Sequence, residues 1–343
     1  MSPFKTLLQH RLAWPLLTLL LLLAANTAFN ASFLHIEWRS GHLYGSLIDI
    51  LNRAAPLVLV SLGMTLVIAT RGIDISVGAV VAIAAAVAAW MIGGSVSGGV
   101  SRFPMPLAIL AALGVALVCG LWNGLLVAKI GMQPIIATLI LMVAGRGIAQ
   151  LIADGQIITI YYTPFFFLGG GYLLGLPFSL FVAGTVFLLL YLAVTRTALG
   201  LFIQAVGINP TAALVAGVQA RRLILYSYAF CGLCAGMAGL LISSNVKSAD
   251  GNNAGQLLEL DAILAVTLGG TALTGGRFSL AGSVVGALII QTLTYAIYSL
   301  GVPPEINLVV KAVVVFLVML LQSAEFRAMV RTWVQRPALE ATP

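Results

Sequence analysis

Long apolar segments with very few charged residues dominate this sequence. The strongest cover residues 16–25, 78–89, 107–118, 178–194 and 308–321. A helix needs roughly 20 apolar residues, each rising about 1.5 Å, to cross the hydrocarbon core of a bilayer. With their flanking residues these segments reach that length. The chain is therefore predicted to be an all-α polytopic protein embedded in a lipid bilayer.

The composition excludes the main alternatives for the whole chain. Of 343 residues, 17 are basic and 10 acidic, so 8% are charged, whereas 61% are hydrophobic. A soluble domain carries roughly a quarter charged residues, which excludes a soluble enzyme and a disordered scaffold. The net charge of +7 does not indicate nucleic-acid binding, because the basic residues stand at the ends of apolar segments and form no cluster.

About ten transmembrane helices are predicted, at about 13–32, 50–70, 75–94, 105–128, 134–153, 176–195, 223–245, 259–275, 280–299 and 305–323. They form one transmembrane domain, residues 13–323, between a cytoplasmic N-terminus (1–12) and a cytoplasmic C-terminal tail (324–343). Paired glycines at 269–270 and 275–276 interrupt the eighth span and predict a broken helix near 259–280. Such a break is tolerated only where the backbone is buried in protein or lines a wet cavity.

The basic residues predict the orientation. With the N-terminus inside and ten spans, eleven basic residues fall on the inner side and four on the outer side, while Arg146 and Lys311 fall within spans. This bias follows the positive-inside rule and predicts that both termini are cytoplasmic. Residues 13–32 could also be a signal peptide. An uncleaved helix is favoured, because cleavage would leave nine spans and spoil the charge pattern.

The longest predicted inner loop, residues 196–222, contains the signals of a short helix. Asn209 is a good N-cap, Pro210 suits the first helical position, and Gly217 suits the left-handed residue after the last turn. A helix is therefore predicted over residues 210–216. From the residues alone, it could be an interfacial helix that joins two spans or a coupling helix that enters a soluble partner.

The pattern A-V-G-x-N-x-x-A-A-x-x-x-G at residues 205–217 resembles the cytoplasmic loop of permease subunits in ribose-type ABC sugar importers. Three further stretches agree in order along the chain: N-R-A-A-P at 52–56, MTLVIATRGIDISVGAV at 64–80, and DAILAVTLGGTALTGGR at 261–277. Within the family the chain looks most similar to the galactofuranose permeases. It departs from the family pattern at Arg71 and at Ile208, where the family usually or often has glycine.

The resemblance implies an import complex in the bacterial inner membrane. Two permease subunits would enclose the path, two cytoplasmic ATPase subunits would drive it, and a periplasmic binding protein would deliver a monosaccharide such as galactofuranose. The second permease would be a related chain, which gives a heterodimer. The residues that would couple this chain to the ATPase are Ala205, Gly207, Asn209, Pro210, Ala212, Ala213 and Gly217.

The chain is predicted to have no energy source or cofactor of its own. A phosphate-binding P-loop needs glycine before its lysine, and none of the four lysines has one, so ATP would be used by the partner subunit. No H-E-x-x-H or G-x-S-x-G motif is present, so neither a metal site nor catalysis is expected. The C-G-L-C sequence of Cys231 and Cys234 is interpreted as helix packing, because it lies in an apolar segment.

A sugar path should offer amides, hydroxyls and a few charged hydrogen-bonding groups. The candidates within or beside the spans are Asn52, Arg53, Asn123, Arg146, Gln150, Glu259, Asp261, Thr267, Thr271 and Gln291. Each has a structural alternative. Arg146 is expected to be held by an acid or by helix-end carbonyls, Lys311 to extend toward the outer face, and Asp74 to pair with Arg71.

The predicted outer segments, residues 34–49 and 247–258, are expected to help dock the binding protein, and the aromatic residues of 154–175 to form a membrane-interface belt. Residues 250–253, D-G-N-N, predict a turn. An ion-coupled secondary sugar transporter is the alternative function. It would usually need a carboxylate deep within a span, whereas the acids here cluster at span ends.

Overall fold

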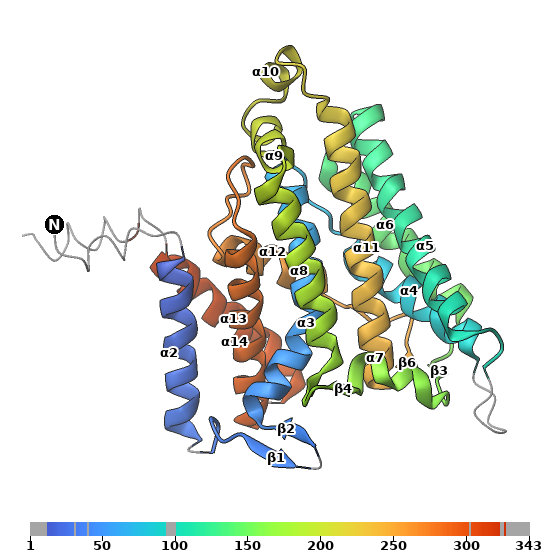
Figure 1. Ribbon diagram of the computed structural model, residues 1–343, viewed down its shortest axis with the longest axis vertical. Coiled ribbons are helices and arrows are strands. Elements are labelled where there is room, and N and C mark those ends of the chain that lie inside the picture. The colour runs from blue at the N-terminus through green and yellow to red at the C-terminus, as the bar shows by residue number, and fades with distance from the viewer. Residues whose placement is uncertain are drawn as a thin grey trace, which may run out of the picture.

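The computed structural model describes residues 12–30, 32–39, 41–93, 101–301, 303–322 and 326. They form a bundle of helices that run roughly parallel and antiparallel to one axis (Figure 1). The predicted all-α architecture is confirmed. The predicted cytoplasmic N-terminus, apart from Leu12, and the predicted C-terminal tail, apart from Phe326, lie outside the described residues.

The helices occupy most of the described chain. Their bounds are α2 Ala13–Phe29, α3 Ser46–Ala69, α4 Val77–Ile92, α5 Met105–Leu125, α6 Pro134–Ile152, α7 Phe167–Gly170, α8 Phe178–Arg196, α9 Leu199–Ile208, α10 Pro210–Val215, α11 Ala220–Val246, α12 Leu258–Leu268, α13 Leu280–Ser299 and α14 Pro304–Gln322. A π-helical turn, Leu126–Ile130, extends α5, and a 3₁₀ turn, Thr163–Phe166, precedes α7.

The strands are short and lie at the end of the bundle opposite α10 (Figure 1). They form three antiparallel pairs: β1 Glu37–Arg39 with β2 His42–Tyr44, β3 Ile158–Thr159 with β6 Ser248–Ala249, and β4 Tyr172–Leu173 with β5 Leu176–Pro177. The β3–β6 pair ties the segment after α6 to the segment after α11. These pairs fix the connections at the predicted outer end.

Six of the described helices are long and apolar enough to cross a membrane: α3, α5 with its π-helical turn, α6, α8, α11 and α13. Shorter apolar helices include α2, α4 and α9. Several predicted spans are therefore present as helices of full length, whereas α4 has only 16 residues and α12 only 11. The number of ten spans and the inward termini stay predictions.

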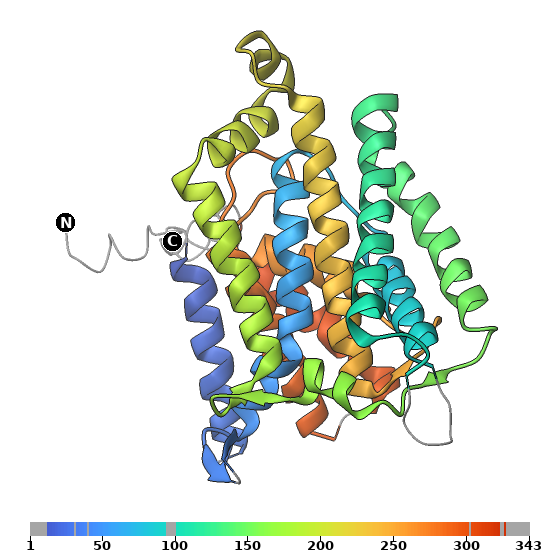
Figure 2. The same cartoon turned by 45° about the vertical axis from the view of Figure 1, so that its right-hand side comes forward.

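The core is built around α3, α4 and α11. Helix α11 packs against α3, α4 and α5, while α2 packs on α13 at the opposite edge of the bundle from α5 and α6 (Figures 1 and 2). Close approach depends on small residues, since a Cβ at Gly63 of α3 would lie 2.7 Å from the Cys231 Cα of α11. Cys231 and Cys234 are buried and free, which confirms that they pack the helix interface.

The broken helix predicted near residues 259–280 is confirmed. Helix α12 ends at Leu268, and α13 begins at Leu280 with the Ser279 side chain accepting from the Gly282 N–H at 3.1 Å. Between them Gly270, Gly275 and Gly276 have φ of 85°, 83° and 92°, which side chains rarely adopt. These glycines let the chain turn sharply at the end of the bundle that carries α10.

Candidate functional site

The inner segment between α8 and α11 contains two helices. Asn209 ends α9 and begins α10, and its Oδ1 accepts from the N–H groups of Thr211 at 3.1 Å and Ala212 at 3.0 Å. Pro210 takes the first helical position, and Gly217 has a φ of 85°. The capping prediction is confirmed, with α10 ending one residue earlier than expected. The sequence analysis did not predict α9.

Helix α10 projects beyond the bundle (Figures 1 and 2). Its Ala213 is buried against Val206 and Ala220, so it holds α10 to α9 and α11. Leu214 and Val215 are 63% and 87% exposed at the tip. Exposed apolar side chains on a protruding element are available for contact with a partner protein or with the membrane interface. The sequence did not single out Leu214 and Val215, because the small alanine residues of the loop were expected to form the contact surface.

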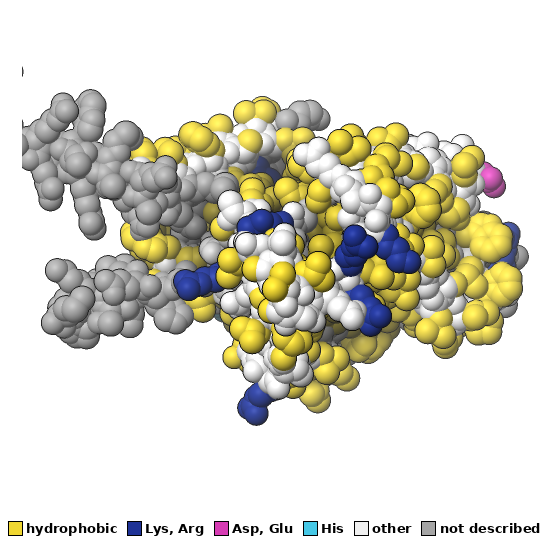
Figure 3. Space-filling view, turned by 90° about the horizontal axis from the view of Figure 1, so that it is seen from above, with side chains coloured by type: hydrophobic (Ala, Val, Ile, Leu, Met, Phe, Trp, Pro, Cys, Tyr) yellow, Lys and Arg dark blue, Asp and Glu magenta, His cyan; other side chains and the backbone are white. Residues whose placement is uncertain are grey.

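The other predicted coupling residues divide in the same way. Gly207 is buried and Ala205 partly buried, whereas Asn209, Ala212 and Gly217 are exposed. Seen from the side of α10, the charged side chains of the described surface are mostly Lys and Arg, with acidic atoms at one edge (Figure 3). This distribution agrees with the predicted cytoplasmic orientation of this face.

The predicted Asp74–Arg71 ion pair is wrong. The Asp74 Oδ1 accepts from the Ser76 N–H at 3.0 Å, the Ser76 hydroxyl at 2.6 Å and the Asn123 amide at 3.3 Å. Arg71 extends away, and its Nε donates to the Gly207 carbonyl at 2.6 Å. The two charges are three residues apart in the sequence, but Arg71 contacts the end of α9 whereas Asp74 bonds to Asn123 of α5. Asn123 is consequently fully buried in this network.

Arg146, in the middle of α6, binds the backbone of the segment that precedes α12. Its Nη1 donates to the carbonyl of Ala254 at 2.6 Å, that of Asn252 at 3.1 Å and that of Gly251 at 3.5 Å. One turn away, the Gln150 amide donates to the Asn252 Oδ1. Carbonyls therefore hold Arg146, but they belong to a turn about 105 residues further along the chain and not to a helix end as expected.

Glu259 lies in the first turn of α12, where its residue is 4% exposed. A Cβ at Gly78, in the first turn of α4, would fall on the Glu259 Oε2 and 3.3 Å from the Arg146 Nη2. Glu259 and Arg146 therefore both lie beside Gly78. No ion pair within 4.0 Å joins them among the described residues, and the buried Oε2 accepts no hydrogen bond there. The positive ends of α4 and α12 favour a carboxylate here.

The structure thus brings together three predicted path residues, Arg146, Gln150 and Glu259, where two helices begin inside the bundle. We call them, with Gly78, the central polar site. The Arg146 Nη1 donates to carbonyl groups, while its Nη2 makes no hydrogen bond within the described chain. A free guanidinium amino group opposite a free carboxylate oxygen can bind neutral hydroxyl groups.

The remaining predicted path residues lie apart from this site. Lys311 of α14 pairs with Asp261 of α12 at 2.6 Å, a partner that the expected outward extension did not include. An ionisable side chain within a membrane helix is usually paired in this way. The others are placed as follows: Asn52 accepts from the Ser179 hydroxyl, Arg53 pairs with Asp49 at 2.9 Å, Thr267 donates to carbonyls of its own helix, buried Thr271 accepts from the Ser279 N–H, and Gln291 is partly buried in α13.

The predicted turn at residues 250–253 is confirmed. The Asp250 Oδ1 accepts from the Asn252 N–H at 2.8 Å and the Asn253 N–H at 3.3 Å, as in an Asx turn. Partial burial raises the Asp250 pKa, but the Asn253 side chain, these two N–H groups and the Arg146 charge outweigh it and lower that pKa overall. Asp250 is thus held ionised directly before residues 251–254, which supply the carbonyl groups that bind Arg146.

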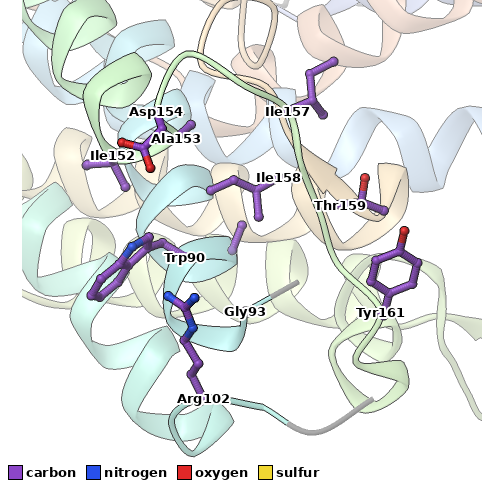
Figure 4. Close-up of a pocket in the computed structure, with 11 residues that line it drawn as sticks. Trp90, Gly93, Arg102, Ile152, Ala153, Asp154, Ile157, Ile158, Thr159 and Tyr161 are labelled. Carbon is purple, nitrogen blue, oxygen red and sulfur yellow. The ribbon is translucent and has the colours of Figure 1, made fainter. Parts of the chain in front are cut away.

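A polar pocket of about 370 Å³ lies at the outer ends of α4 and α6 (Figure 4). Trp90, Arg102, Asp154, Thr159 and Tyr161 are among its lining residues, and the Arg102 guanidinium lies 5.9 Å from the Trp90 ring centre. The sequence did not reveal it, because three separate segments form it. Nearby Phe165 is fully buried, so the predicted aromatic belt of 154–175 is wrong for this residue.

Comparison with known proteins identifies the family. Residues 46–319 match the family described as "Branched-chain amino acid transport system / permease component". The chain belongs to this permease family. It is 49% identical to the galactofuranose transporter permease protein YtfT of Escherichia coli (strain K12), over 96% of each chain. It is 39% identical to the fructose import permease protein FruF of Bifidobacterium longum, over 98% of this chain and 94% of that one.

A third relative, the ribose import permease protein RbsC of Escherichia coli (strain K12), is 35% identical over 90% of this chain and 92% of its own. No solved structure matches the chain. The permease is thus a multi-pass inner-membrane subunit of an ABC importer, and a separate subunit hydrolyses ATP. Membership also implies a substrate-binding partner. Nothing in these similarities favours the ion-coupled alternative.

Proposed function

We propose that this permease imports galactofuranose with a second, related permease chain, a cytoplasmic ATPase and a periplasmic sugar-binding protein. The observation that carries the proposal is 49% identity with a galactofuranose transporter permease over 96% of both chains. The fructose and ribose import permeases are less similar, at 39% and 35%. All three relatives are named as sugar transport permeases, which supports a monosaccharide as the cargo.

The central polar site is the proposed contact for the sugar. A monosaccharide is neutral and rich in hydroxyl groups, which both donate and accept hydrogen bonds. The Arg146 Nη2 can donate to one sugar oxygen, and the Glu259 Oε2 can accept from another hydroxyl. Neither group needs to lose a partner among the described residues to do so. The free energy of binding would therefore not be reduced by breaking an existing ion pair.

Helix α10 is the proposed coupling element. ATP binds the partner subunit, and no cofactor is bound by this chain. Closure of the ATPases would move the apolar tip at Leu214 and Val215, and with it α9 and the helices on either side. Alternating exposure of the central polar site to the two faces would then import the sugar without any covalent step on this chain.

The outer face is proposed to receive the binding protein through residues 34–49 and 247–258. The second segment continues from the Asp250 turn into the carbonyls that Arg146 binds. Docking on this segment would therefore act on the same residues that contact the sugar. Charge reversal at Lys247 that leaves uptake and ATPase stimulation unchanged would contradict this docking assignment.

The deciding experiment uses the complete complex in proteoliposomes. The four kinds of subunit are co-expressed, purified by a tag on this chain, and identified by mass spectrometry. Uptake of radiolabelled galactofuranose is then compared with that of galactopyranose, fructose and ribose, with and without internal ATP. ATP-dependent uptake of galactofuranose above the other three is expected. Preferred uptake of another sugar, or uptake driven by an ion gradient without ATP, would overturn the proposal.

A further inference from the structure

At the end of the bundle near α10, carbonyl groups at the ends of α3 and α9 find donors outside their own helices. The last carbonyl groups of any helix have no partner within the helix. Here the α9 carbonyls of Gly207 and Ile208 accept from the Arg71 Nε, at 2.6 Å, and from its Nη2. The α3 carbonyl of Ala69 accepts from the Gly276 N–H at 2.9 Å. We call these contacts the inner junction.

The junction is closely packed. A Cβ at Gly207 would fall on the Ala69 carbonyl and the Gly276 N–H, and a Cβ at Gly275 would lie 2.5 Å from the Arg71 Cγ. Packed backbone with no free space transmits displacement, because any motion of one segment is resisted at once by the next. Three segments are joined in this way: the end of α9, the turn after α3, and the turn between α12 and α13.

Arg71 has a backbone conformation that favours glycine. Its φ is 65°, in the left-handed region where glycine is preferred and a side chain is strained. The guanidinium offsets this strain with two hydrogen bonds to carbonyls at the negative end of α9. The side chain thus spans from α3 to α9, which a glycine could not do.

The junction lies directly between α10 and the central polar site. On one side, Ile208 is followed by Asn209, whose side chain caps α10. On the other side, the turn after Arg71 leads through Asp74 and Ser76 into α4, and Gly276 belongs to the turn that follows α12. Helices α4 and α12 carry Gly78 and Glu259. Both helices that begin at the central polar site are therefore linked to α9 through this junction.

We propose that Arg71 is the positioning residue that carries the movement of α10 to α4 and α12. The guanidinium ties the α3–α4 turn to the end of α9, and the packing of Gly207 against Ala69 and Gly276 extends this link to the α12–α13 turn. This inference rests on the proposed function of α10 in ATP coupling. It assigns to Arg71 a role in transport although Arg71 touches no sugar.

The test separates coupling from assembly. Arg71→Gly suits the backbone at φ 65° and removes only the side-chain link. In the complete complex, we expect normal assembly and retained ATP hydrolysis, with about a tenfold rise in ATP hydrolysed per sugar imported. Arg71→Lys should restore part of the uptake, because its ammonium group can reach one carbonyl. Leu174→Gly is the control, since Leu174 has a φ of 51° in an outer turn.

Spin-label distances provide a readout that a purely structural role would not give. Cysteine is introduced for spin labelling at two exposed positions, Val215 on α10 and Leu273 in the α12–α13 turn. In each case the distance is measured to a second label at exposed Val118 on α5. In the otherwise unchanged complex, both distances should change when ATP binds. In Arg71→Gly, the Val215 distance should change as before and the Leu273 distance should change less, because only the packing of Gly207 against Gly276 remains. If the Leu273 distance changes as much as in the complex without substitutions, or if a lysine variant is as poorly coupled as the glycine variant, the proposal is wrong.

Other failures remain distinguishable. Loss of ATP hydrolysis together with uptake in Arg71→Gly would mean that Arg71 acts at the ATPase contact, which also overturns the inference. If the complex without substitutions imports none of the sugars tested, the proposed function fails by itself. The nucleotide-dependent distances test the link through Arg71 independently of the sugar.

Discussion

The inner junction and the central polar site are both places where helices end or begin inside the bundle, but their polar groups are used differently. At the junction, the Arg71 hydrogen bonds and the Gly276 N–H satisfy carbonyls at the ends of two helices. At the central polar site, a buried Glu259 oxygen lacks a partner among the described residues, although Arg146 is near. The polar groups of the junction are paired, whereas those of the central polar site include an unpaired carboxylate oxygen, which is why the sugar contact is proposed there.

The largest expected effect comes from removing Arg146. Arg146→Ala would leave three carbonyls without the charged donor that they share, which should cost about 3 kcal/mol of unfolding free energy. Thermal unfolding of the purified permease in detergent measures this loss. Unchanged stability would show that the central polar site is solvated more freely than its burial indicates.

A smaller loss is expected where the junction has no space. Gly207→Ala places a methyl group against backbone atoms of α3 and the α12–α13 turn, and overpacking of this kind costs about 1–3 kcal/mol. Gly184→Ala in α8 is the matched control, because no atom lies within 4 Å of its Cβ position. Equal unfolding temperatures for the two variants would contradict the close packing of the junction.

The Asn209 cap between α9 and α10 should contribute less to stability than the packing at Gly207. Asn209→Ala removes two hydrogen bonds and should destabilise α10 by about 1 kcal/mol. Hydrogen exchange of the α10 amides should then become faster, by about fivefold. Asn209→Asp keeps an accepting oxygen and should preserve protection. If alanine leaves the exchange rates unchanged, α10 is held by the packing of Ala213 alone.

The smallest effect is expected at the outer boundary. Arg53 and Asp49 form an exposed pair one helical turn apart, which contributes less than about 1 kcal/mol. Arg53→Ala should therefore leave both thermal unfolding and sugar uptake nearly unchanged. A selective loss of uptake without loss of stability would place Arg53 on the sugar path after all and weaken the distinction drawn for the central polar site.

Local features of the sequence predicted local structure well. Asn209, Pro210 and Gly217 act on the residues beside them, so the position of α10 could be read directly. The glycine pairs likewise predicted the break after α12, because their backbone freedom is a property of single residues. The long apolar segments predicted the membrane helices for the same reason.

Contacts between distant segments could not be read in this way. Arg71 and Asp74 are three residues apart, yet each bonds to a different helix. Arg146 binds carbonyls of residues 251–254, and nothing in the sequence near Arg146 indicates them. Spacing along the chain says which side chains share a helix face, whereas these partners depend on how the whole bundle packs.

The exposed Leu214 and Val215 have a consequence for the cell. If α10 contacts the ATPase as proposed, a copy of this chain made without its ATPase would leave two aliphatic side chains uncovered at the tip of α10. Quality-control proteases and chaperones act on surfaces of this kind. We therefore expect the abundance of this subunit to follow the supply of its ATPase, with surplus copies degraded.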